Sequence, residues 1–334
     1  EYAAAGKARL EAAFLMVMRG IAENDGYNAL VLKAGLQWRD IVLIRAISRF
    51  MRQVRLPFSQ DYMWNTLRAH PACAAKLVEL FHARFDPRVA AETRAQREAE
   101  IAAEIEEALK SVPSLDEDRI LRHFVNAVQS AIRTNFYQLG KDGLPKPQIA
   151  IKYESRKLTT LPAPRPLYEI FVYSPRVEGV HLRFGKVARG GIRWSDRPQD
   201  FRTEVLGLVK AQQVKNAVIV PVGAKGGFVP KRLAAGAARE VVQAEGVASY
   251  KLLVSSLLDI TDNLGAEGVI PPREVVRHDG DDPYLVVAAD KGTATFSDIA
   301  NGISAEHAFW LGDAFASGGS AGYDHKGMGI TARG

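Results

Sequence analysis

Cysteine is nearly absent from this sequence, because Cys73 is the only one in 334 residues. A single thiol cannot form an internal disulfide, so we expect a reducing compartment, with the cytoplasm as the default. Long apolar runs are lacking too. The stretch Ile41–Ile47 is interrupted by Arg45 and falls short of the ~20 apolar residues that span a bilayer. We therefore expect no membrane segment.

The opening residues also lack the pattern of a signal peptide. Residues Glu1–Gly20 have no basic start, apolar middle and small-residue cleavage site. Because Glu1 stands where a complete chain has methionine, we expect the sequence to begin inside a longer protein.

Charge of one sign does not dominate. Lysine and arginine total 44 against 38 acidic residues, which gives a formal net charge of +6. The basic residues are spread along the chain and do not form a stripe, so we expect no nucleic-acid partner and read the charge as weak support for anionic ligands. The composition, 47% hydrophobic and 25% charged, is that of a globular protein long enough for two domains.

The first part of the chain has apolar residues at helical spacing, interrupted by Pro57, Pro71 and Pro87. The pattern predicts helices over Lys7–Ile21, Trp38–Val54, Asp61–Ala69, Ala74–Phe85 and Arg88–Lys110. Ser114 and Glu117 have capping-box spacing and start one more apolar stripe, which runs from Leu121 to Phe136 and predicts a helix that Gly140 closes.

Composition changes to glycine and proline at Lys141–Gln148, and the apolar period then becomes alternating. We place a domain boundary here, with an all-helical region over residues 1–146 and an α/β domain over 147–334. Strands are predicted around Ile149–Tyr153, Tyr168–Val172, Val180–Phe184, Ala217–Val222 and Leu285–Ala288. Helices are predicted over Asp200–Lys215 and Arg232–Glu245, and around Ala248–Leu258.

The residues that can carry chemistry gather between Arg189 and Lys225. The segment Arg189–Asp196 reads Arg-Gly-Gly-Ile-Arg-Trp-Ser-Asp, and a predicted helix to Lys215 and a strand follow it. A predicted turn, Gly223–Gly227, then holds Lys225. Two lysines flanking one strand can converge on an anion, because glycine lets a backbone approach a ligand closely.

On its residues alone, Gly223–Gly227 is either a loop that cradles phosphate or a chance glycine turn, and it lacks the spacing of a P-loop. No Gly-x-Gly-x-x-Gly opens a helix after a strand, so the chain shows no dinucleotide fingerprint. The histidines have no metal-ligand spacing, and no serine lies in a Gly-x-Ser-x-Gly elbow. We interpret Asp279, Asp281 and Asp282 as a solvated turn without a metal, and we weigh Arg193 and Arg197 mainly as partners of Asp196 or Asp200.

In order, the motifs Arg-Gly-Gly-Ile-Arg-Trp-Ser, Thr203-Glu204-Val205, Lys215, Gly-Ala-Lys-Gly-Gly and Ala288-Ala289-Asp290 resemble the substrate domain of glutamate dehydrogenases. The variants Gly-Gly-Ile-Arg-Trp-Ser-Asp-Arg and Asp290-Lys-Gly-Thr-Ala-Thr-Phe-Ser-Asp resemble the large-subunit, NAD-specific class. The resemblance implies an α/β substrate-binding domain with a mixed sheet and flanking helices, preceded by an all-helical region. It also implies that the Rossmann nucleotide domain lies outside this chain.

The resemblance also implies roles for single residues. Lys215 would hold the α-carboxylate of glutamate, with Gly190 and Gly191 close to the substrate. Lys225 would activate the water that attacks the imine, and Asp290 would shuttle protons. A lysine that works on water must be partly neutral, which burial and a neighbouring cation favour; Lys215 is the candidate neighbour.

Two ends of the site depart from the pattern of the small hexameric enzymes. Leu206 replaces the lysine that binds the substrate's side-chain carboxylate in those enzymes, and either Arg189 or Lys210 can take that role. We favour Arg189, since arginine binds carboxylates bidentately. At the end of the chain, Gly327–Gly334 resembles the segment that leads into the nucleotide domain, with Thr331 reaching the nicotinamide, although a glycine-rich loop is an equal interpretation.

The expected activity is the NAD-dependent, reversible oxidative deamination of L-glutamate to 2-oxoglutarate and ammonia by a cytoplasmic homo-oligomer. We expect this part of the chain to supply the substrate site and to be inactive alone, because a cleft between two domains needs both walls. One alternative is a non-catalytic module in which the glycine turn and basic residues bind an anion or nucleic acid. Another is a helical scaffold for assembly or regulation.

Overall fold

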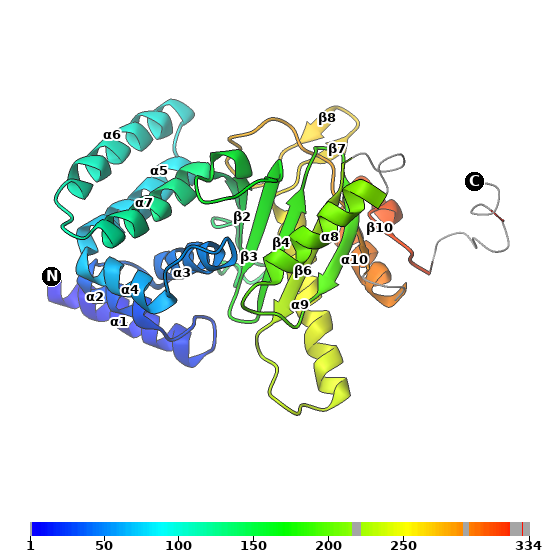
Figure 1. Cartoon of the computed structure of the whole chain (residues 1–334), viewed down its shortest axis with the longest axis horizontal. Coiled ribbons are helices and arrows are strands. Elements are labelled where there is room, and N and C mark those ends of the chain that lie inside the picture. Colours follow the sequence, from blue (N-terminus) through cyan, green and yellow to red (C-terminus); the bar gives the residue numbers. More distant parts are fainter. Residues whose placement is uncertain (1, 216–221, 290–293, 321–328, 330–334) are drawn as a thin grey trace.

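The computed structural model describes residues 2–215, 222–289, 294–320 and 329. A bundle of helices lies beside a twisted sheet, and further helices cover the sheet (Figure 1). The predicted α/β fold with a mixed sheet and a helical lead-in is confirmed.

The helical region begins at the first described residue and ends where the sheet starts. Its elements are α1 (Tyr2–Met18), the 3₁₀ turn η1 (Gly26–Ala29), α2 (Leu30–Lys33), α3 (Trp38–Gln53), α4 (Gln60–Ala69), α5 (Pro71–Phe85), α6 (Ala91–Leu109) and α7 (Leu115–Ser130). Pro71 is the first residue of α5, where its missing N–H costs no hydrogen bond. Ser114 caps α7 by accepting a hydrogen bond from the Glu117 N–H.

The prediction that helix continues to Phe136 is wrong. Helix α7 ends at Ser130, and Ala131–Thr134 form β1, which pairs with β2 (Ile149–Glu154) at the edge of the sheet. The stripe misled because Ile132 is buried in a strand just as it would be in a helix. The predicted all-helical region therefore contains one strand. The division at residue 146 stays a prediction, and one buried apolar cluster runs from α3 through α7 into the sheet.

The remaining elements form the sheet and its cover. They are β3 (Tyr168–Tyr173), β4 (Val177–Arg183), β5 (Arg189–Trp194), α8 (Phe201–Lys215), β6 (Ala224–Pro230), α9 (Arg239–Asp259), β7 (Asn263–Gly265), β8 (Gly268–Ile270), β9 (Val286–Ala289), α10 (Ala294–Glu306) and β10 (Ala316–Ser317), with short 3₁₀ turns at Ser155–Lys157 and Gly312–Ala314. Helix α9 is continuous where two helical segments were predicted. Its Gly246 lies so close to the Trp194 ring that a Cβ there would sit 2.0 Å from it.

The eight-stranded sheet has the order β1-β2-β3-β4-β6-β5-β9-β10. Neighbouring strands are antiparallel from β1 to β6 and parallel from β6 to β10. One face packs against α3, α7 and α8, and the other against α9 and α10. The parallel half is the part that carries the motifs singled out in the sequence.

Asp279 and Asp282 are not in a solvated turn. Both carboxylates are buried under the antiparallel edge of the sheet, where Lys152 donates to Asp279 at 2.6 Å and to Asp282 at 2.8 Å. Arg133 binds Asp279 and Asp262, and Arg183 binds Asp282. Although burial raises the pKa of the Asp282 carboxyl, the charges of Lys152 and Arg183 outweigh it and hold that pKa below its usual value. This ion-pair cluster fixes the segment after α9 to β1, β2 and β4.

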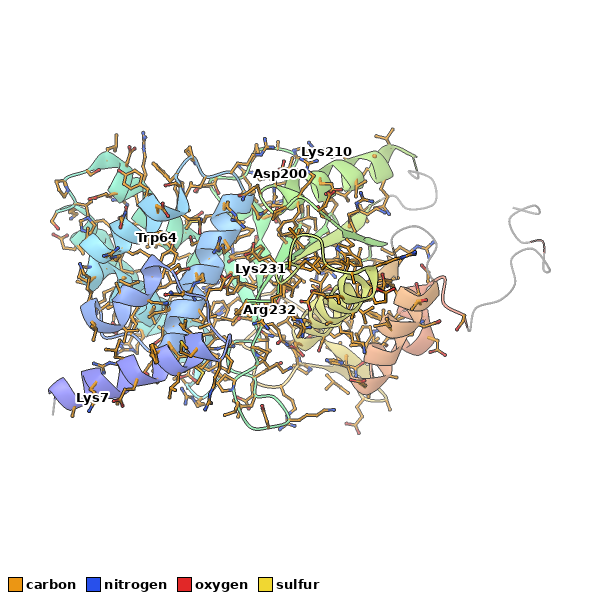
Figure 2. All side chains as sticks on the ribbon, turned by 90° about the horizontal axis from the view of Figure 1, so that it is seen from below. Lys7, Trp64, Asp200, Lys210, Lys231 and Arg232 are labelled. Atoms are coloured by element: carbon orange, nitrogen blue, oxygen red, sulfur yellow. The ribbon has the colours of Figure 1, made fainter. Side chains whose placement is uncertain are left out.

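The helical region is tied to the sheet by a second group of charges. Figure 2 places Lys231 between the two parts, and its ammonium lies 2.7 Å from Glu23 and 3.2 Å from Glu178. Glu178, which is in β4, also binds Arg52 of α3 at 3.0 Å. Among the described residues, no helix is long and apolar enough to cross a membrane.

Candidate substrate site

The predicted glycine turn is a strand. Ala224–Pro230 form β6, which lies in the interior of the sheet between β4 and β5. Its peptide groups face paired strands on both sides, with Gly226 opposite His181 and Ile192. A turn was predicted here because the segment Gly223–Gly227 contains three glycines. Here glycine is needed for close packing, since a Cβ on Gly227 would lie 2.4 Å from the Val205 side chain.

Lys225 projects from β6 on the face that α8 covers. A Cβ added to Gly223 would lie 2.6 Å from the Gln212 side chain of α8, and one added to Gly227 would meet Val205 of the same helix. Side chains alternate along a strand, so Lys225 lies on that face. His181, whose ring lies 3.2 Å from a Cβ on Gly226, is on the opposite face, where burial lowers its pKa to about 3.

The two strands that flank Lys225 place a glycine on one side of it and Leu182 on the other. Arg189 pairs with Gly223 and Ile192 with Gly226, a constant offset of 34, so Gly191 is opposite Lys225. Gly191 in turn pairs with Ala288 of β9. Helix α8 packs mainly on β4 and β6. On the β5 side of Lys225 the next side chains are therefore a hydrogen and, one strand further, a methyl group, whereas Leu182 of β4 lies opposite Lys225 on its other side. Gly191 and Lys225 are both half-buried.

Lys225 makes no hydrogen bond or ion pair within the described part of the chain. This distinguishes it from Lys152 and Lys231, which are both paired with carboxylates. An ammonium or amine held in a central strand without an acidic partner is available to a ligand. The geometry suits a small anionic or carbonyl substrate lying over Gly191 and Ala288.

The two glycines of the Arg-Gly-Gly motif have different roles in the fold. A Cβ on Gly190 would lie 1.7 Å from the Ala224 carbonyl oxygen, so only glycine fits where β5 approaches β6. The Arg189 carbonyl accepts a hydrogen bond from Gln212 Nε2 at 2.8 Å. This bond fixes the last turn of α8 beside the start of β5, next to the strand position of Lys225.

The first turn of α8 is fixed by Glu204. Its carboxylate accepts hydrogen bonds from Ser195 Oγ at 2.5 Å and from Arg193 Nε at 2.9 Å, and so joins the end of β5 to the helix. Arg202 binds Glu169 of β3 in a buried pair, and its N–H donates to Gln53 of α3 at 3.2 Å. Helix α8 is thus held by the sheet and by the helical region together.

The arginines after the motif behave largely as structural residues. Arg197 pairs with Asp200 three residues later, as the sequence interpretation allowed, and Arg193 pairs with Glu204, which was not among its predicted partners. The Arg189 side chain is exposed at the open end of the same face as Lys225, whereas Lys210 is exposed on the outside of α8 (Figure 2). Leu206 packs against the apolar cluster. Of the two candidates for the substrate's side-chain carboxylate, Arg189 lies on the face that carries Lys225.

Three predicted site residues lie wholly or partly outside the part of the chain that the structure describes. Lys215 is the last residue of α8, one turn beyond Gln212, but its side chain lies outside the described part. Asp290 and Thr331 lie outside the described residues, as does the predicted strand Ala217–Val222. Asp290 directly follows β9, whose Ala288 is paired with Gly191. Glu204 was named in the sequence only within a motif and without a role, and Gln212 was not named, because a polar helical residue that supports a neighbouring strand has no local signature.

We expect Gly227→Ala to destabilise the 334-residue chain by about 1–3 kcal/mol, because the new methyl group forces the buried Val205 and with it α8 away from β6. Gly207→Ala is the matched control. It lies within α8 with nothing within 4 Å of its added Cβ, so it should stabilise the chain by about 0.5–1 kcal/mol. Urea unfolding followed by circular dichroism measures both. Equal effects of the two substitutions would contradict the close contact between α8 and β6.

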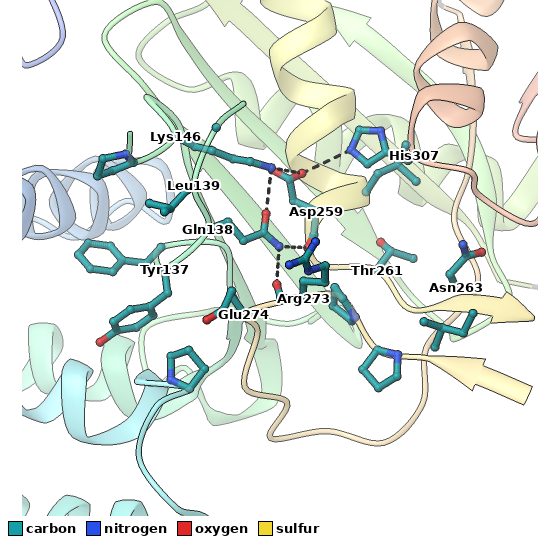
Figure 3. Close-up of a pocket in the computed structure, with 18 of the residues that line it drawn as sticks. Tyr137, Gln138, Leu139, Lys146, Asp259, Thr261, Asn263, Arg273, Glu274 and His307 are labelled. Atoms are coloured by element: carbon teal, nitrogen blue, oxygen red, sulfur yellow. Dashed lines mark hydrogen bonds and ion pairs between the residues drawn. The ribbon is translucent and has the colours of Figure 1, made fainter. Parts of the chain in front are cut away.

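A cleft elsewhere in the described part of the chain does not contain these residues. It has a volume of about 1000 Å³ and lies between the helical region and the β1 edge of the sheet (Figure 3). Its lining residues include none of Arg189, Gly191 and Lys225. An open sheet face bounded by one helix is not a closed cavity, and a second wall would be needed to enclose a substrate there. Within the described ranges, no group of three acidic, histidine or cysteine side chains is placed to hold a metal ion.

Comparison with known protein families gives two matches. Residues 104–334 match the family described as bacterial NAD-glutamate dehydrogenase, catalytic domain. Residues 22–87 match the family described as glutamate dehydrogenase, helical motif 3. The first match covers the whole sheet and includes α7, and so it crosses the domain boundary predicted at residue 146.

Curated relatives agree. The chain is 60% identical over 327 residues to the NAD-specific glutamate dehydrogenase of Pseudomonas aeruginosa. The aligned region covers 97% of this chain and 20% of that protein. The chain is 56% identical over 336 residues to the enzyme of the same name from Mycobacterium tuberculosis, covering 98% and 21%. The match to the Neurospora crassa enzyme is 26% over 302 residues. The chain spans about a fifth of the length of the bacterial relatives.

Proposed function

Because the chain belongs to the bacterial NAD-glutamate dehydrogenase family, we propose that it supplies the substrate-binding face of an NAD-dependent enzyme that reversibly deaminates L-glutamate to 2-oxoglutarate and ammonia. The observation that carries the proposal is the position of Lys225, unpaired within the described residues, beside Gly191 and Ala288. We also propose that the complete protein is a cytoplasmic homo-oligomer, in keeping with a single cysteine.

In this proposal glutamate lies over Gly191 with its Cα near Lys225. Lys215, at the end of α8, binds the α-carboxylate, and Arg189 binds the side-chain carboxylate at the open end of the same face. The backbone of Gly190 and Gly191 lets the substrate lie close to the sheet, since a side chain at position 191 would occupy that space. Gln212 and Glu204 act indirectly by holding α8 against β5 and β6.

The dinucleotide supplies hydride acceptance when it is bound. The described residues contain no dinucleotide fingerprint, and Thr331 lies outside them. After the Cα hydrogen has left as hydride, water adds to the imine carbon of the substrate. Lys225 accepts one proton of that water as its oxygen bonds to the carbon, and Asp290 gives a proton to the nitrogen. The C–N bond then breaks, ammonia leaves, and Asp290 takes up the proton of the new hydroxyl group, which leaves the keto group of 2-oxoglutarate. The reverse direction runs through the same groups.

The alternative of an anion- or nucleic-acid-binding module loses its main support. A loop cradles phosphate with free backbone N–H groups, whereas β6 is paired with β4 and β5 on its two sides. The most deeply buried lysines and arginines, such as Lys152, Arg133 and Arg202, are engaged in ion pairs within the fold. A substrate site that uses single unpaired cations fits these observations better.

The function is tested with the complete natural chain, by measuring glutamate-dependent NAD reduction for wild type and Arg189→Met. Loss of one charge-assisted bond of roughly 1.5–3 kcal/mol lowers kcat/KM for glutamate about 10- to 150-fold. Norvaline, which lacks the side-chain carboxylate, is the matched control substrate, and its kcat/KM should change less than about threefold. A wild type without glutamate-dependent turnover refutes the function. An equal loss with both substrates refutes only the role of Arg189.

A further inference from the structure

Arg39 is a buried arginine that has no carboxylate partner among the described residues. It lies in the first turn of α3 and is 8% exposed. Within the described residues, five other arginines are as deeply buried, and each has a carboxylate partner. These pairs are Arg45–Asp25, Arg84–Glu98, Arg133–Asp262, Arg183–Asp282 and Arg202–Glu169. Arg39 alone among these six departs from the rule that buried charges are paired.

The unpaired atoms of Arg39 are the two that bind carboxylates elsewhere in this molecule. Its Nε and Nη2 are buried and have no hydrogen-bond partner within the described part. In Arg45 the same two atoms donate hydrogen bonds to the two carboxylate oxygens of Asp25, Nε at 2.6 Å and Nη2 at 2.8 Å. In Arg176 they donate to Glu245 at 2.9 and 2.7 Å. This fork of two N–H groups matches the two oxygens of one carboxylate.

Arg39 lies at the wall of the 1000 Å³ cleft between the helical region and the β1 edge of the sheet. The guanidinium is stacked over the Phe136 ring, 5.1 Å from its centre, and Phe136 also lines the cleft. Burial lowers the pKa of Arg39 to about 10, and the carboxylate of Asp40 only partly offsets this effect. A carboxylate bound here would restore the charge balance that the other buried arginines have.

The rest of the cleft favours a small organic anion. Its charged lining residues include the cations Arg88, Lys146 and Arg273 besides Arg39, against the carboxylates of Asp259 and Glu274. Much of the remaining lining is apolar. These residues include Leu139, Pro145, Ile270, Pro271, Pro272 and Phe309. The volume is at the upper end of the range for small-molecule sites.

One end of the cleft is already organised by hydrogen bonds. Figure 3 shows Lys146 and His307 converging on the buried Asp259, with distances of 2.6 and 3.4 Å. Gln138 accepts from Lys146 at 2.9 Å and donates to the Arg273 carbonyl at 2.9 Å. The hydrogen bond to Asp259 raises the pKa of His307, which favours positive charge at this end. These groups come from the β1–β2 connection, α9 and the segment after α10, so the wall opposite the helical region is fixed.

We propose that this cleft binds a small organic acid, whose carboxylate pairs with Arg39 and whose apolar body lies against the proline- and leucine-rich wall. Because Nε and Nη2 are sealed from solvent, the guanidinium turns toward the cleft over the Phe136 ring when the acid binds. The site is distinct from the proposed substrate face. The β1 edge is four strands away from β6 in the sheet, roughly 20 Å at the usual strand spacing.

The test labels arginines of the complete natural chain with phenylglyoxal and follows each one by peptide mass spectrometry. Hexanoate is the probe, hexanamide its neutral control, and inorganic phosphate a control for charge alone. Hexanoate at ten times its dissociation constant should slow labelling of Arg39 about tenfold and leave the exposed Arg119 unchanged. Hexanamide should do nothing.

Three results would overturn the proposal. Arg39 that never reacts is inaccessible or already paired with another part of the long chain. If phosphate slows the labelling of Arg39 as much as hexanoate does, the site has no preference for a carboxylate. If hexanoate leaves the labelling of Arg39 unchanged, the cleft does not bind the acid. A second measurement uses Arg39→Met, which should melt no lower than wild type in the absence of an acid and should lose the rise in Tm that hexanoate gives wild type. If it instead melts as low as Arg202→Met, whose arginine is paired, Arg39 has an internal partner and the proposal fails.

Discussion

Replacing Lys225 by methionine in the complete natural chain should lower kcat for glutamate oxidation about 1000-fold, with the KM for glutamate changed less than about fivefold. The magnitude follows from the 10²–10⁴-fold that a positioned acid or base contributes to proton transfer. KM should change little, because in the proposed site Lys215 and Arg189 bind the two carboxylates of the substrate. The stability of the fold should also be nearly kept, since Lys225 is half-buried and has no ion pair within the described residues.

Lys251→Met is the matched control for this prediction. Lys251 is an exposed lysine of α9, the helix on the other face of the sheet, so its loss should leave kcat within about twofold. The measurement is steady-state NAD reduction at saturating glutamate, with circular dichroism to show that both variants are folded. A folded Lys225→Met variant that keeps more than a tenth of the wild-type rate would remove Lys225 from the chemistry.

The largest effect on stability is expected from Arg133→Met, which should cost the 334-residue chain about 3–5 kcal/mol. Arg133 is fully buried and binds Asp262 at 2.9 Å and Asp279 at 2.6 Å, and it also donates to the Ile260 and Gly280 carbonyls. Methionine fills a similar volume but leaves two buried carboxylates with less compensation. Arg277 and Lys152 still neutralise part of this charge, so the cost should not exceed the range given.

The double variant Arg133→Met/Asp262→Asn separates charge from packing. If uncompensated charge causes the loss, removing the Asp262 charge should recover about 0.5–3 kcal/mol relative to the sum of the single effects. Arg119→Met is the surface control, since its pair with Asp116 is exposed, and it should change stability by less than about 0.5 kcal/mol. Urea midpoints give all four values. A cost below about 1 kcal/mol for Arg133→Met would mean that the buried cluster does not hold the sheet edge.

Helices and strands could be predicted well where the local spacing of apolar residues determines the structure. Trp38–Gln53 and Gln60–Ala69 were anticipated nearly to the residue, because their apolar stripes are regular and proline or serine marks their ends. Strands β2, β3 and β4 followed from strict alternation. A helix was predicted over Asp200–Lys215, and α8 spans Phe201–Lys215.

The predictions were wrong where contacts between residues distant in sequence determine the secondary structure or the burial. Ala131–Thr134 continue a helical stripe yet form a strand, because β2 offers an edge to pair with. Gly223–Gly227 has the composition of a turn but lies in the sheet, where the glycines make room for Val205 and the Gln212 side chain. Asp279 and Asp282 look solvated in sequence and are buried, because Arg133 and Lys152 come from strands about 130 to 150 residues earlier.

The candidate site shows the same division. Arg189, Gly190, Gly191 and Lys225 could be named from motifs, and the structure brings them onto neighbouring strands in register. The supporting roles of Gln212 and Glu204 could not be predicted, since they depend on which strand α8 lies against. Arg39 was unremarkable in sequence, and only the pairing of every other buried arginine shows that its partner is missing within the described residues.

The most direct test of the central claim is a structure of the complete natural chain with 2-oxoglutarate bound. We predict the ligand on the face of β5 and β6 that α8 borders, with its keto carbon next to the Lys225 ammonium and its side-chain carboxylate at Arg189. A ligand found only on the α9 face of the sheet, or only in the cleft at Arg39, would contradict the assignment of the substrate site.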